Sequence, residues 1–401
     1  MSELHPMPAL AVTASTLVTA LGAGRQANWQ AIREGRTGLA PADRPDLYAT
    51  WWGRVAGLET APLPDDWAAF DCRNHRLARL ALETDAFAAR VREASERLGA
   101  SRIGLFVGTS TSGIAETEQA YAEAAPELTA LRDDFDLCKI HNIGALATFV
   151  QRWLGLSGPA LSISTACSSS AKVFASAARA IAAGVCDAAV VGGVDSLCLT
   201  TLYGFHSLNL VSPEPCRPWD RDRQGINIGE AAGFVLLEPA ESAAAEAVEA
   251  RFLGYGESAD AHHMSTPHPE GQGARAAMEQ ALARAGLAPG DIDYVNLHGT
   301  GTPSNDAAED AAMAAVFGPD IACSSTKGWT GHTLGAAGIV EAILAMLALR
   351  AQQVPGNLNL QTPDPALATP VQRETAPRAL RHVMSNSFGF GGSNCALVFG
   401  Q

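Results

Sequence analysis

One thiol and two histidines occur on small-residue turns of this chain, where such side chains can do nucleophilic and proton-transfer chemistry. Cys167 lies in the stretch LSISTACSSSAKV, which begins at Leu161. His298 opens HGTGT, and His332 ends KGWTGH, which begins at Lys327. A free cysteine is most often a small buried hydrophobe. The thiol therefore needs a base or an electrophilic partner elsewhere in the chain before it can be interpreted as a nucleophile.

The position of Cys167 favours reactivity. A short apolar stretch with β-branched residues precedes it, and an Ala-rich stretch with helically spaced apolar residues follows it up to Gly184. This pattern predicts a buried strand, a tight turn at Cys167 and then a helix. The free N–H groups and the positive dipole end of a helix N-terminus favour a thiolate. The small residues around the thiol leave room for a substrate.

A predicted strand leads His298 directly into a glycine-rich turn. Glycine lets the backbone approach a ligand closely, and the hydroxyls of Thr300 and Thr302 can form hydrogen bonds. The turn lacks the GxxxxGK[ST] spacing of a phosphate-binding P-loop, so that site is not predicted. Taken alone, a histidine that merely ends a strand is an equally good interpretation.

His332 stands at the predicted start of a strongly apolar helix. A helix N-terminus depresses the pKa of a histidine, so we expect a neutral ring that can donate one N–H. Glu341 lies in the same apolar segment and needs a partner there. We favour a structural ion pair, with Lys327 as the candidate partner, over direct catalysis by Glu341.

Phe388 and Phe390 alternate with glycines in NSFGFGG, residues 386–392. Large rings on such a loop suit the lining or the gate of a pocket. Core aromatic residues beside a terminal strand are the competing interpretation, which is preferable if this motif is taken alone.

The composition is that of an ordinary globular protein: 47% of the 401 residues are hydrophobic and 17% are charged. The formal charge of −14 argues against broad binding to nucleic acid or to anionic membranes. The eight cysteines form no CxxC pair, so neither a zinc motif nor a thioredoxin motif is present, and a reducing cytosol is favoured. The N-terminus does not have the pattern of a secretory signal. The sequence contains no uninterrupted apolar run of about 18 residues, so we do not expect a membrane span.

Strand-like and helix-like stretches alternate along the chain, which predicts an α/β fold. A weak internal echo, LSISTACSSS and IACSSTKGWTGHTLGAAG, indicates two similar halves joined by a helix at 241–250. The expected strands are 103–107, 161–164, 188–191, 234–237, 294–297, 321–324 and 396–399, and the expected helices are 76–98, 170–183, 243–249, 273–285 and 335–350.

Four motifs occur in an order and spacing that resemble the elongating β-ketoacyl-acyl carrier protein synthases of the KAS I/II type. They are TAC at 165–167, HGTGT at 298–302, K-x3-GH at 327–332 and NSFGFGG at 386–392. The resemblance covers essentially the whole chain. It implies a thiolase-like α/β fold in which two related halves form a five-layer αβαβα arrangement. Residues 1–246 would carry the nucleophilic cysteine, and residues 247–401 would carry the two histidines that distinguish this group from thiolases and initiating synthases.

The resemblance also implies a reaction. Cys167 takes an acyl chain from the phosphopantetheine arm of an acyl carrier protein and forms a thioester. His298 and His332 donate hydrogen bonds to the thioester carbonyl of malonyl-carrier protein, and they stabilise the enolate that decarboxylation produces. The carbanion attacks the acyl-Cys and releases a β-ketoacyl chain extended by two carbons. By the same resemblance Lys327 supports His332 and the electrostatics of the site, and the backbone N–H groups of Cys167 and Phe390 form the oxyanion hole.

Roles for further residues follow from the resemblance. Thr300 and Thr302 would contact the pantetheine arm. Phe388 and Phe390 would gate the acyl pocket, and Thr111 would limit it. No redox cofactor or catalytic metal is expected, because the phosphopantetheine arrives on the carrier protein. A structural cation is an additional expectation, near Asn296, Glu309, Glu341 and Asn386.

Carrier proteins are acidic, and so is this chain, so docking requires a local basic patch. Arg73, Arg76 and Arg79 in RNHRLAR share a predicted helix face and form the densest candidate. A solvated or dimer-facing helix is an equally good interpretation.

Three stretches depart from the usual fatty-acid pattern: SSSAKV after TAC, RQGINIGEAAG at 223–233, and Thr111 within GTSTSG. They leave both fatty-acid elongation and specialised type II polyketide or aryl polyene extension open. We expect a cytoplasmic homodimer, or a heterodimer with a Cys-less, chain-length-factor-like homologue without which the chain is inactive. Cys167 argues against this chain being the Cys-less partner. A cysteine thioester hydrolase that uses Cys167 and His298 is a further alternative, which the second histidine and the lysine disfavour.

Overall fold

The structure is a computed structural model that describes residues 5–124, 131 and 135–401. Strands and helices alternate through the described chain, as the α/β prediction requires. The strands are β1 (Leu10–Thr19), β2 (Gly22–Ala23), β3 (Ala40–Pro41), β4 (Trp51–Gly53), β5 (Ile103–Gly108), β6 (Ala160–Ile163), β7 (Ala188–Asp195), β8 (Ile228–Gly229), β9 (Ala231–Pro239), β10 (Ala250–Ala259), β11 (Tyr294–Asn296), β12 (Cys323–Ser324), β13 (Gln353–Val354), β14 (Ala376–Pro377), β15 (His382–Gly389) and β16 (Ser393–Gly400). The α-helices are α1 (Arg25–Arg33), α2 (Arg73–Glu83), α3 (Phe87–Leu98), α4 (Ile114–Glu123), α5 (Gly144–Trp153), α6 (Ser169–Ala182), α7 (Leu199–Ser207), α8 (Gln272–Ala285), α9 (Pro303–Phe317), α10 (Lys327–Thr330) and α11 (Ala337–Ala351).

The main sheet contains the same strand order twice. In the first half the order across the sheet is β1-β9-β7-β5-β6, and in the second half it is β10-β16-β15-β11-β12. If the five strands of each half are numbered one to five along the chain, their order across the sheet is 1-5-4-2-3 in both halves. An antiparallel pairing of β1 with β10 joins the two sets. The repeated order agrees with two related halves; the division at residues 246 and 247 falls between β9 and β10 and stays a prediction.

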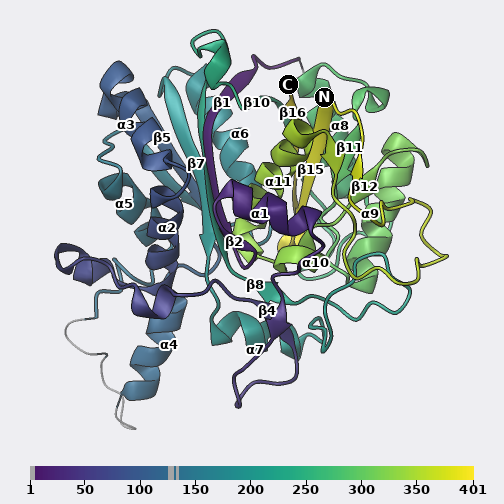
Figure 1. Ribbon diagram of the computed structural model, residues 1–401, viewed down its shortest axis with the longest axis horizontal. Helices are drawn as coiled ribbons and strands as arrows, with labels where there is room; N and C mark the ends of the chain where they lie inside the picture. The colour runs from purple at the N-terminus through teal and green to yellow at the C-terminus, as the bar shows by residue number, and fades with distance from the viewer. Residues whose placement is uncertain (1–4, 125–130, 132–134) are drawn as a thin grey trace.

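Helices separate and cover the two sets of strands (Figure 1). Helices α2, α3 and α5 lie outside the first set, α6 and α11 lie between the two sets, and α8 and α9 lie outside the second set. The five-layer αβαβα arrangement expected from the sequence is confirmed by this order of layers. The ends of strands and the starts of the central helices α6 and α11 are therefore the places where the two halves can combine their side chains.

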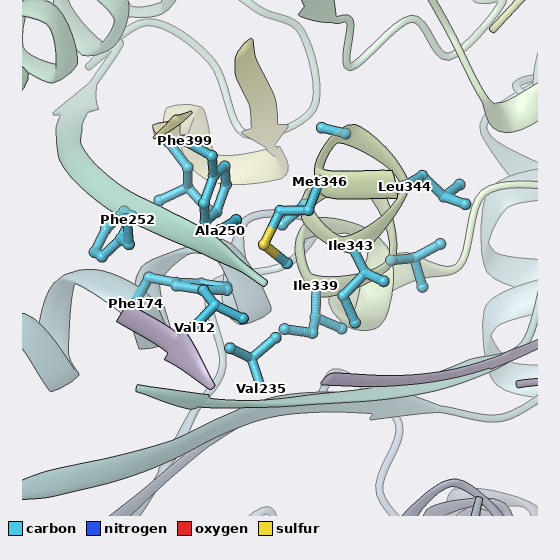
Figure 2. Packing of buried hydrophobic residues seen from close by; sticks show 14 of the residues in the cluster. Val12, Phe174, Val235, Ala250, Phe252, Ile339, Ile343, Leu344, Met346 and Phe399 are labelled. Carbon is cyan, nitrogen blue, oxygen red and sulfur yellow. The ribbon is translucent and has the colours of Figure 1, made fainter. Parts of the chain in front are cut away.

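Helix α11 fills the centre of the molecule, and for that reason all of its residues except Glu341 and Arg350 are apolar. Figure 2 shows Ile339 and Ile343 of α11 near Val235 of β9, with Phe399 of β16 in the same cluster. The segment Leu334–Ala351 has 18 residues and a mean hydropathy of 1.8, enough by length and composition to cross a membrane, but 83% of it is buried inside the protein. The burial explains its apolarity as that of a core helix.

Two helix predictions were wrong. The stretch 76–98 is two helices, because Asp85 and Ala86 adopt left-handed φ values of 53° and 56° between α2 and α3. The stretch 243–249 contains only a short 3-10 turn, Ala245–Ala247. Its Ala-rich sequence favours a helix, but Glu249 turns inward to an ion pair with Arg25 and begins the approach to β10. Tertiary contacts override helix propensity here.

Candidate active site

The nucleophile lies on a strained turn between β6 and α6, as the strand-turn-helix prediction expected. Ala166 has a left-handed φ of 53°, which a non-glycine residue adopts at a cost of about 1 kcal/mol or more. The neighbouring hydroxyls fasten the turn: Ser168 donates to the carbonyl of Thr165 at 2.9 Å, and Ser169 accepts from the N–H of Thr165 at 2.9 Å. The small hydroxyl residues around Cys167 thus hold a turn that aims its thiol.

His332 contacts the thiol directly. Its Nε2 lies 3.0 Å from Sγ of Cys167. The N–H of Leu334 points at its Nδ1 at 3.2 Å, so Nδ1 accepts and the proton of the neutral ring is assigned to Nε2. His332 therefore presents an N–H donor to the sulfur and to the space beside it.

His298 follows β11 and presents its ring beside His332. The two ring centroids are 5.4 Å apart with an interplanar angle of 84°. The ammonium of Lys327 lies 3.3 Å from Nδ1 of His298, which again leaves Nε2 as the N–H donor. The backbone N–H of His298 donates to Glu309 at 2.8 Å, which fixes the turn after the strand.

Lys327 and Glu341 form the buried ion pair that the sequence predicted. Their side chains are 1% and 3% exposed. The same ammonium donates to the carbonyl oxygen of His298. The lysine contacts His298 directly and acts on His332 through its charge, which agrees with the expected influence of Lys327 on the electrostatics of the site. A lysine that contacts both a carboxylate and the His298 backbone holds that histidine in place.

Burial decides the protonation of the three reactive side chains. Burial raises the pKa of the Cys167 thiol to about 11, against the opposing effects of Lys327 and of the Phe390 N–H. Burial lowers the pKa of His298 and of His332 well below the usual range, and the positive charge of Lys327 lowers both further. The neutral His332 agrees with the sequence expectation, although its main cause is burial. The raised pKa of Cys167 favours the neutral thiol, in contrast to the thiolate that a helix N-terminus favours.

The three side chains open into one cavity. Phe388, Phe390, Thr300 and Thr302 line it, as predicted for residues that meet a substrate. Sequence reasoning did not predict the remaining wall, which comes from α7, from the loop after β10 and from the segment around residue 226. These residues include Phe205, Leu210, Ile226, Asp260, Ser265 and Thr266. The cavity therefore combines an apolar side with a hydroxyl-rich side, and the reactive groups lie in it.

The NSFGFGG turn packs on the nucleophile turn. The backbone N–H of Phe390 lies against the thiol of Cys167. A Cβ at Gly389 would stand 2.8 Å from the carbonyl oxygen of Thr165, so only glycine permits this approach. A turn in this place can present an N–H to an oxygen that gains charge during acyl transfer.

Thr111 does not line the described cavity, so its predicted role as a limit of the acyl pocket lacks support within this chain. Its side chain is buried and its hydroxyl donates to Asp195 at 2.9 Å. Sequence reasoning missed Asp195, which is fully buried at the end of β7. The one signal was an acidic residue at the end of an otherwise apolar strand, VVGGVD.

The predicted basic patch is not a free cationic surface. Arg73, Arg76 and Arg79 all lie on α2, but each guanidinium contacts a carboxylate. The Arg73 side chain is only 14% exposed and is paired with Glu230 and Glu59. Charges that are neutralised within the chain attract an acidic partner weakly, so the prediction of carrier docking at this helix loses its physical basis.

The four residues expected near a structural cation offer suitable oxygens. Within the described structure, Oδ1 of Asn296, Oδ1 of Asn386 and Oε2 of Glu341 are buried and have no hydrogen-bond partner. Burial raises the pKa of Glu309 to about 7. Carboxylate and amide oxygens are ligands that hard cations prefer, so these residues fit such an ion. It would neutralise buried carboxylate charge behind His298.

The reactive set itself also has the chemistry of metal ligands. The thiol of Cys167 and ring nitrogens of His298 and His332 lie within 4.8 Å of one another. Thiolate and imidazole are the donors that zinc prefers. The expectation of a metal-free reaction therefore stays a prediction.

Comparison with known proteins decides the family. The N-terminal domain model of the β-ketoacyl synthases matches residues 7–243, and the C-terminal domain model matches residues 249–361. The chain belongs to the β-ketoacyl synthase family. It is similar to the 3-oxoacyl-[acyl-carrier-protein] synthase 2 of Vibrio cholerae, with 35% identity over 97% of this chain and 98% of the relative.

Solved structures with the same fold include ketosynthases bound to chain length factors. The ketosynthase ApeO, in complex with its chain length factor ApeC from Xenorhabdus doucetiae, is 38% identical with a TM-score of 0.89 and covers 98% of both chains. The ishigamide ketosynthase/chain length factor is 29% identical with a TM-score of 0.87, and the match covers 98% of this chain and 99% of that one. The thiolase-like fold predicted from the motifs is confirmed. The enzyme is an acyltransferase that carries out the β-ketoacyl condensation.

Proposed function

We propose that this chain is the catalytic ketosynthase of a heterodimer and extends carrier-protein-bound chains in a type II polyketide or polyene pathway. The observation that carries the catalytic assignment is the contact of 3.0 Å between Cys167 and His332, with His298 beside them. A Cys-less, chain-length-setting homologue would lack this nucleophile. Relatives of known structure that carry a chain length factor support the pairing. Fatty-acid elongation by a homodimer is the second candidate, supported by the similarity to the Vibrio synthase.

An exposed sheet edge supports a partner chain. Strand β6 lies at the end of the main sheet and pairs with β5, and the rest of the described chain does not cover its outer edge. Leu161 in this strand is 54% exposed. An uncovered edge with a large apolar side chain favours pairing with another sheet. We therefore place the partner on β6, next to the turn that carries Cys167.

The proposed steps use each side chain at the atom that the geometry presents. The Cys167 sulfur attacks the acyl thioester of the first carrier protein, the carbon–sulfur bond to the pantetheine breaks, and the thiol proton ends on the departing pantetheine sulfur. The N–H groups of Cys167 and Phe390 stabilise the oxyanion of this step.

Malonyl-carrier protein binds next, with its pantetheine arm along Thr300 and Thr302. The Nε2–H groups of His298 and His332 donate to the thioester carbonyl oxygen while carbon dioxide leaves. The resulting enolate carbon attacks the acyl-Cys carbonyl, the carbon–sulfur bond to Cys167 breaks, and the departing thiolate takes up a proton from solvent. Lys327 holds His298 through these steps without touching the substrate.

Intact mass spectrometry tests the proposal most directly. The purified chain, alone and co-expressed with a Cys-less homologue, is mixed with acyl-carrier protein and then with malonyl-carrier protein. We expect one acyl group on Cys167, which malonyl-carrier protein clears with release of a β-ketoacyl product, and we expect turnover only with the partner. Turnover by the chain alone would support the homodimer and fatty-acid alternative. Free acid released without malonate would instead identify a thioester hydrolase.

Two further expectations belong to the same proposal. We propose that the reaction needs no metal or redox cofactor, which metal analysis of the active enzyme and assays with a chelator would test. A structural cation at the Asn296 and Glu341 oxygens would be detected in the metal analysis as a bound ion, but it would take no direct part in the reaction. We also place the enzyme in the cytoplasm, a compartment that agrees with eight free cysteines.

A further inference from the structure

Asp195 is a buried carboxylate outside the predicted reactive set. It ends β7 and is 0% exposed, and within the described residues it has no cationic partner. One of its oxygens, Oδ1, accepts from the hydroxyl of Thr109 at 2.7 Å and from the N–H groups of Ser110 and Thr111 at 2.8 and 3.0 Å. The other oxygen, Oδ2, accepts from the N–H of Gly335. A single side chain thus joins the loop after β5 to the start of the central helix segment.

Gly335 lies three residues after His332 in the chain. Its hydrogen bond to Asp195 fixes the turn that orients the His332 ring. Leu334, between them, has a left-handed φ of 52°. This conformation turns the N–H of Leu334 back to Nδ1 of His332, and that contact leaves the proton on Nε2 facing the thiol. A buried leucine does not adopt a left-handed φ without help from its surroundings. The hydrogen bond from Gly335 to Asp195 immediately after it provides that help.

The loop on the other side of Asp195 reaches the nucleophile turn. Ser110, whose N–H donates to Asp195, places its hydroxyl 3.4 Å from the carbonyl oxygen of Ala166. Ala166, directly before Cys167, also has a left-handed φ, like Leu334 after His332. Asp195 therefore lies between two strained backbone positions, one beside each partner of the Cys167–His332 contact.

We propose that Asp195 is a positioning residue for the condensation, which sets the Nε2–H of His332 against the Cys167 sulfur by holding both turns. The inference rests on the roles of His332 and Cys167 given under the proposed function. It does not require Asp195 to touch substrate. It assigns the residue to orientation of the catalytic donor, in contrast to a buried carboxylate that only stabilises the fold.

The substitution Asp195→Asn removes the acceptor for Gly335 and weakens the remaining hydrogen bonds by removing the negative charge. Asparagine keeps one carbonyl oxygen for the donors of the loop after β5, but its amide group then faces the N–H of Gly335 as donor against donor. The turn after His332 loses its anchor while the side-chain volume is nearly unchanged. Gly335→Ala tests the same contact from the other side, because its Cβ would stand 2.8 Å from Oδ2 of Asp195 and 2.6 Å from the Ser110 hydroxyl.

Glu238→Gln is the matched control. Glu238 is also a buried strand-end carboxylate, 3% exposed; it accepts from the hydroxyl of Thr13 at 2.8 Å and, unlike Asp195, pairs with an arginine, Arg97. It contacts neither turn of the reactive set. The assay measures decarboxylation of malonyl-carrier protein by the acylated enzyme, with rates expressed per Cys167 that has accepted an acyl group, and thermal midpoints are recorded for each variant.

For Asp195→Asn and Gly335→Ala we expect kcat for decarboxylation to fall ~10- to 100-fold, with KM for malonyl-carrier protein within about twofold of wild type. Glu238→Gln should keep the wild-type kcat whatever its thermal midpoint. A kcat of Asp195→Asn within about twofold of wild type would overturn the inference. So would parallel losses in the Glu238 control.

If Asp195→Asn does not fold, the Gly335→Ala variant tests the inference, because it retains the carboxylate. A kcat for decarboxylation within about twofold of wild type in that variant would then overturn the inference. Absence of acylation and condensation in the wild-type enzyme would refute the proposed function instead, so the two failures are distinguishable.

Discussion

Removal of the Lys327 ammonium should separate the stability of the site from its catalysis. In Lys327→Met an unbranched apolar side chain one atom shorter replaces the lysine, and the ammonium donors are lost. Glu341 then remains 3% exposed with no compensating charge, and its Oε2 already has no hydrogen-bond partner in the described structure. Breaking a buried ion pair in this way costs about 3–5 kcal/mol. His298 loses the donor on Nδ1 at 3.3 Å that sets its tautomer.

The double variant Lys327→Met with Glu341→Gln separates the two consequences. Replacing the carboxylate by an amide removes the unpaired charge, so most of the lost stability should return. His298 still lacks its partner, so decarboxylation should stay ~100- to 1000-fold below wild type, the usual effect of losing one oxyanion donor. Stability is restored and activity is not.

The pH dependence gives a further check. Burial raises the pKa of Glu341 to about 7, even though Lys327 lowers it. Without the lysine the folded-state pKa rises further, while the unfolded value stays near 4.5. A raised folded-state pKa destabilises the fold progressively as the pH rises toward that value. The difference in stability between wild type and Lys327→Met should therefore be smaller at about pH 6 than at about pH 8.5.

Thermal and urea denaturation at the two pH values, together with the decarboxylation assay, measure these effects. An equal loss of stability at both pH values, or no recovery in the double variant, would refute the reasoning about the unpaired carboxylate. Wild-type decarboxylation by Lys327→Met would refute the role of the lysine in holding His298.

Three shorter predictions concern the reactive set. Cys167→Ala should show no gain of acyl mass with acyl-carrier protein, and an acylated variant would place the nucleophile elsewhere. His298→Ala should still become acylated but lose decarboxylation by ~100- to 1000-fold; normal decarboxylation in that variant contradicts the assigned donor. Because burial raises the pKa of Cys167 to about 11, its alkylation by iodoacetamide should accelerate about tenfold per pH unit through the alkaline range. A plateau near neutral pH, read by mass spectrometry, would contradict the neutral resting thiol.

The sequence predicted strands within β5, β6, β7, β9, β11, β12 and β16, and it missed β15 and the two strands at the centre of the sheet, β1 and β10. LAVTASTLVT, which forms β1, intersperses apolar residues with hydroxyls, yet all ten residues are buried. The hydroxyl of Thr13 donates to Glu238, that of Ser15 to Glu249 and that of Thr16 to the carbonyl of Ala81. These partners lie far away in the sequence. A local pattern cannot reveal that such polar side chains are satisfied inside a core.

The same limit separates the predicted from the missed parts of the site. Cys167, His298 and His332 stand in short motifs with their own turn chemistry, and the structure brings them together. Asp195 receives its hydrogen bonds from residues 85 and 140 positions away, so no local motif marks it. The apparent basic patch illustrates the same limit only in part: the buried Glu230, distant in sequence, accepts two hydrogen bonds from Arg73, whereas Arg76 and Arg79 pair with the nearby Asp71 and Glu83.

The resting state of the thiol shows how burial can outweigh a favourable local position. A rise of the Cys167 pKa from 9.0 to about 11 corresponds to ~3 kcal/mol against the thiolate. A helix N-terminus typically provides only about 0.3–1 kcal/mol in its favour. The N–H groups of His332 and Phe390 that face the sulfur therefore do not keep it ionised. They can instead act when negative charge develops on the sulfur or on a substrate oxygen beside it, which is when donors accelerate an acyl transfer.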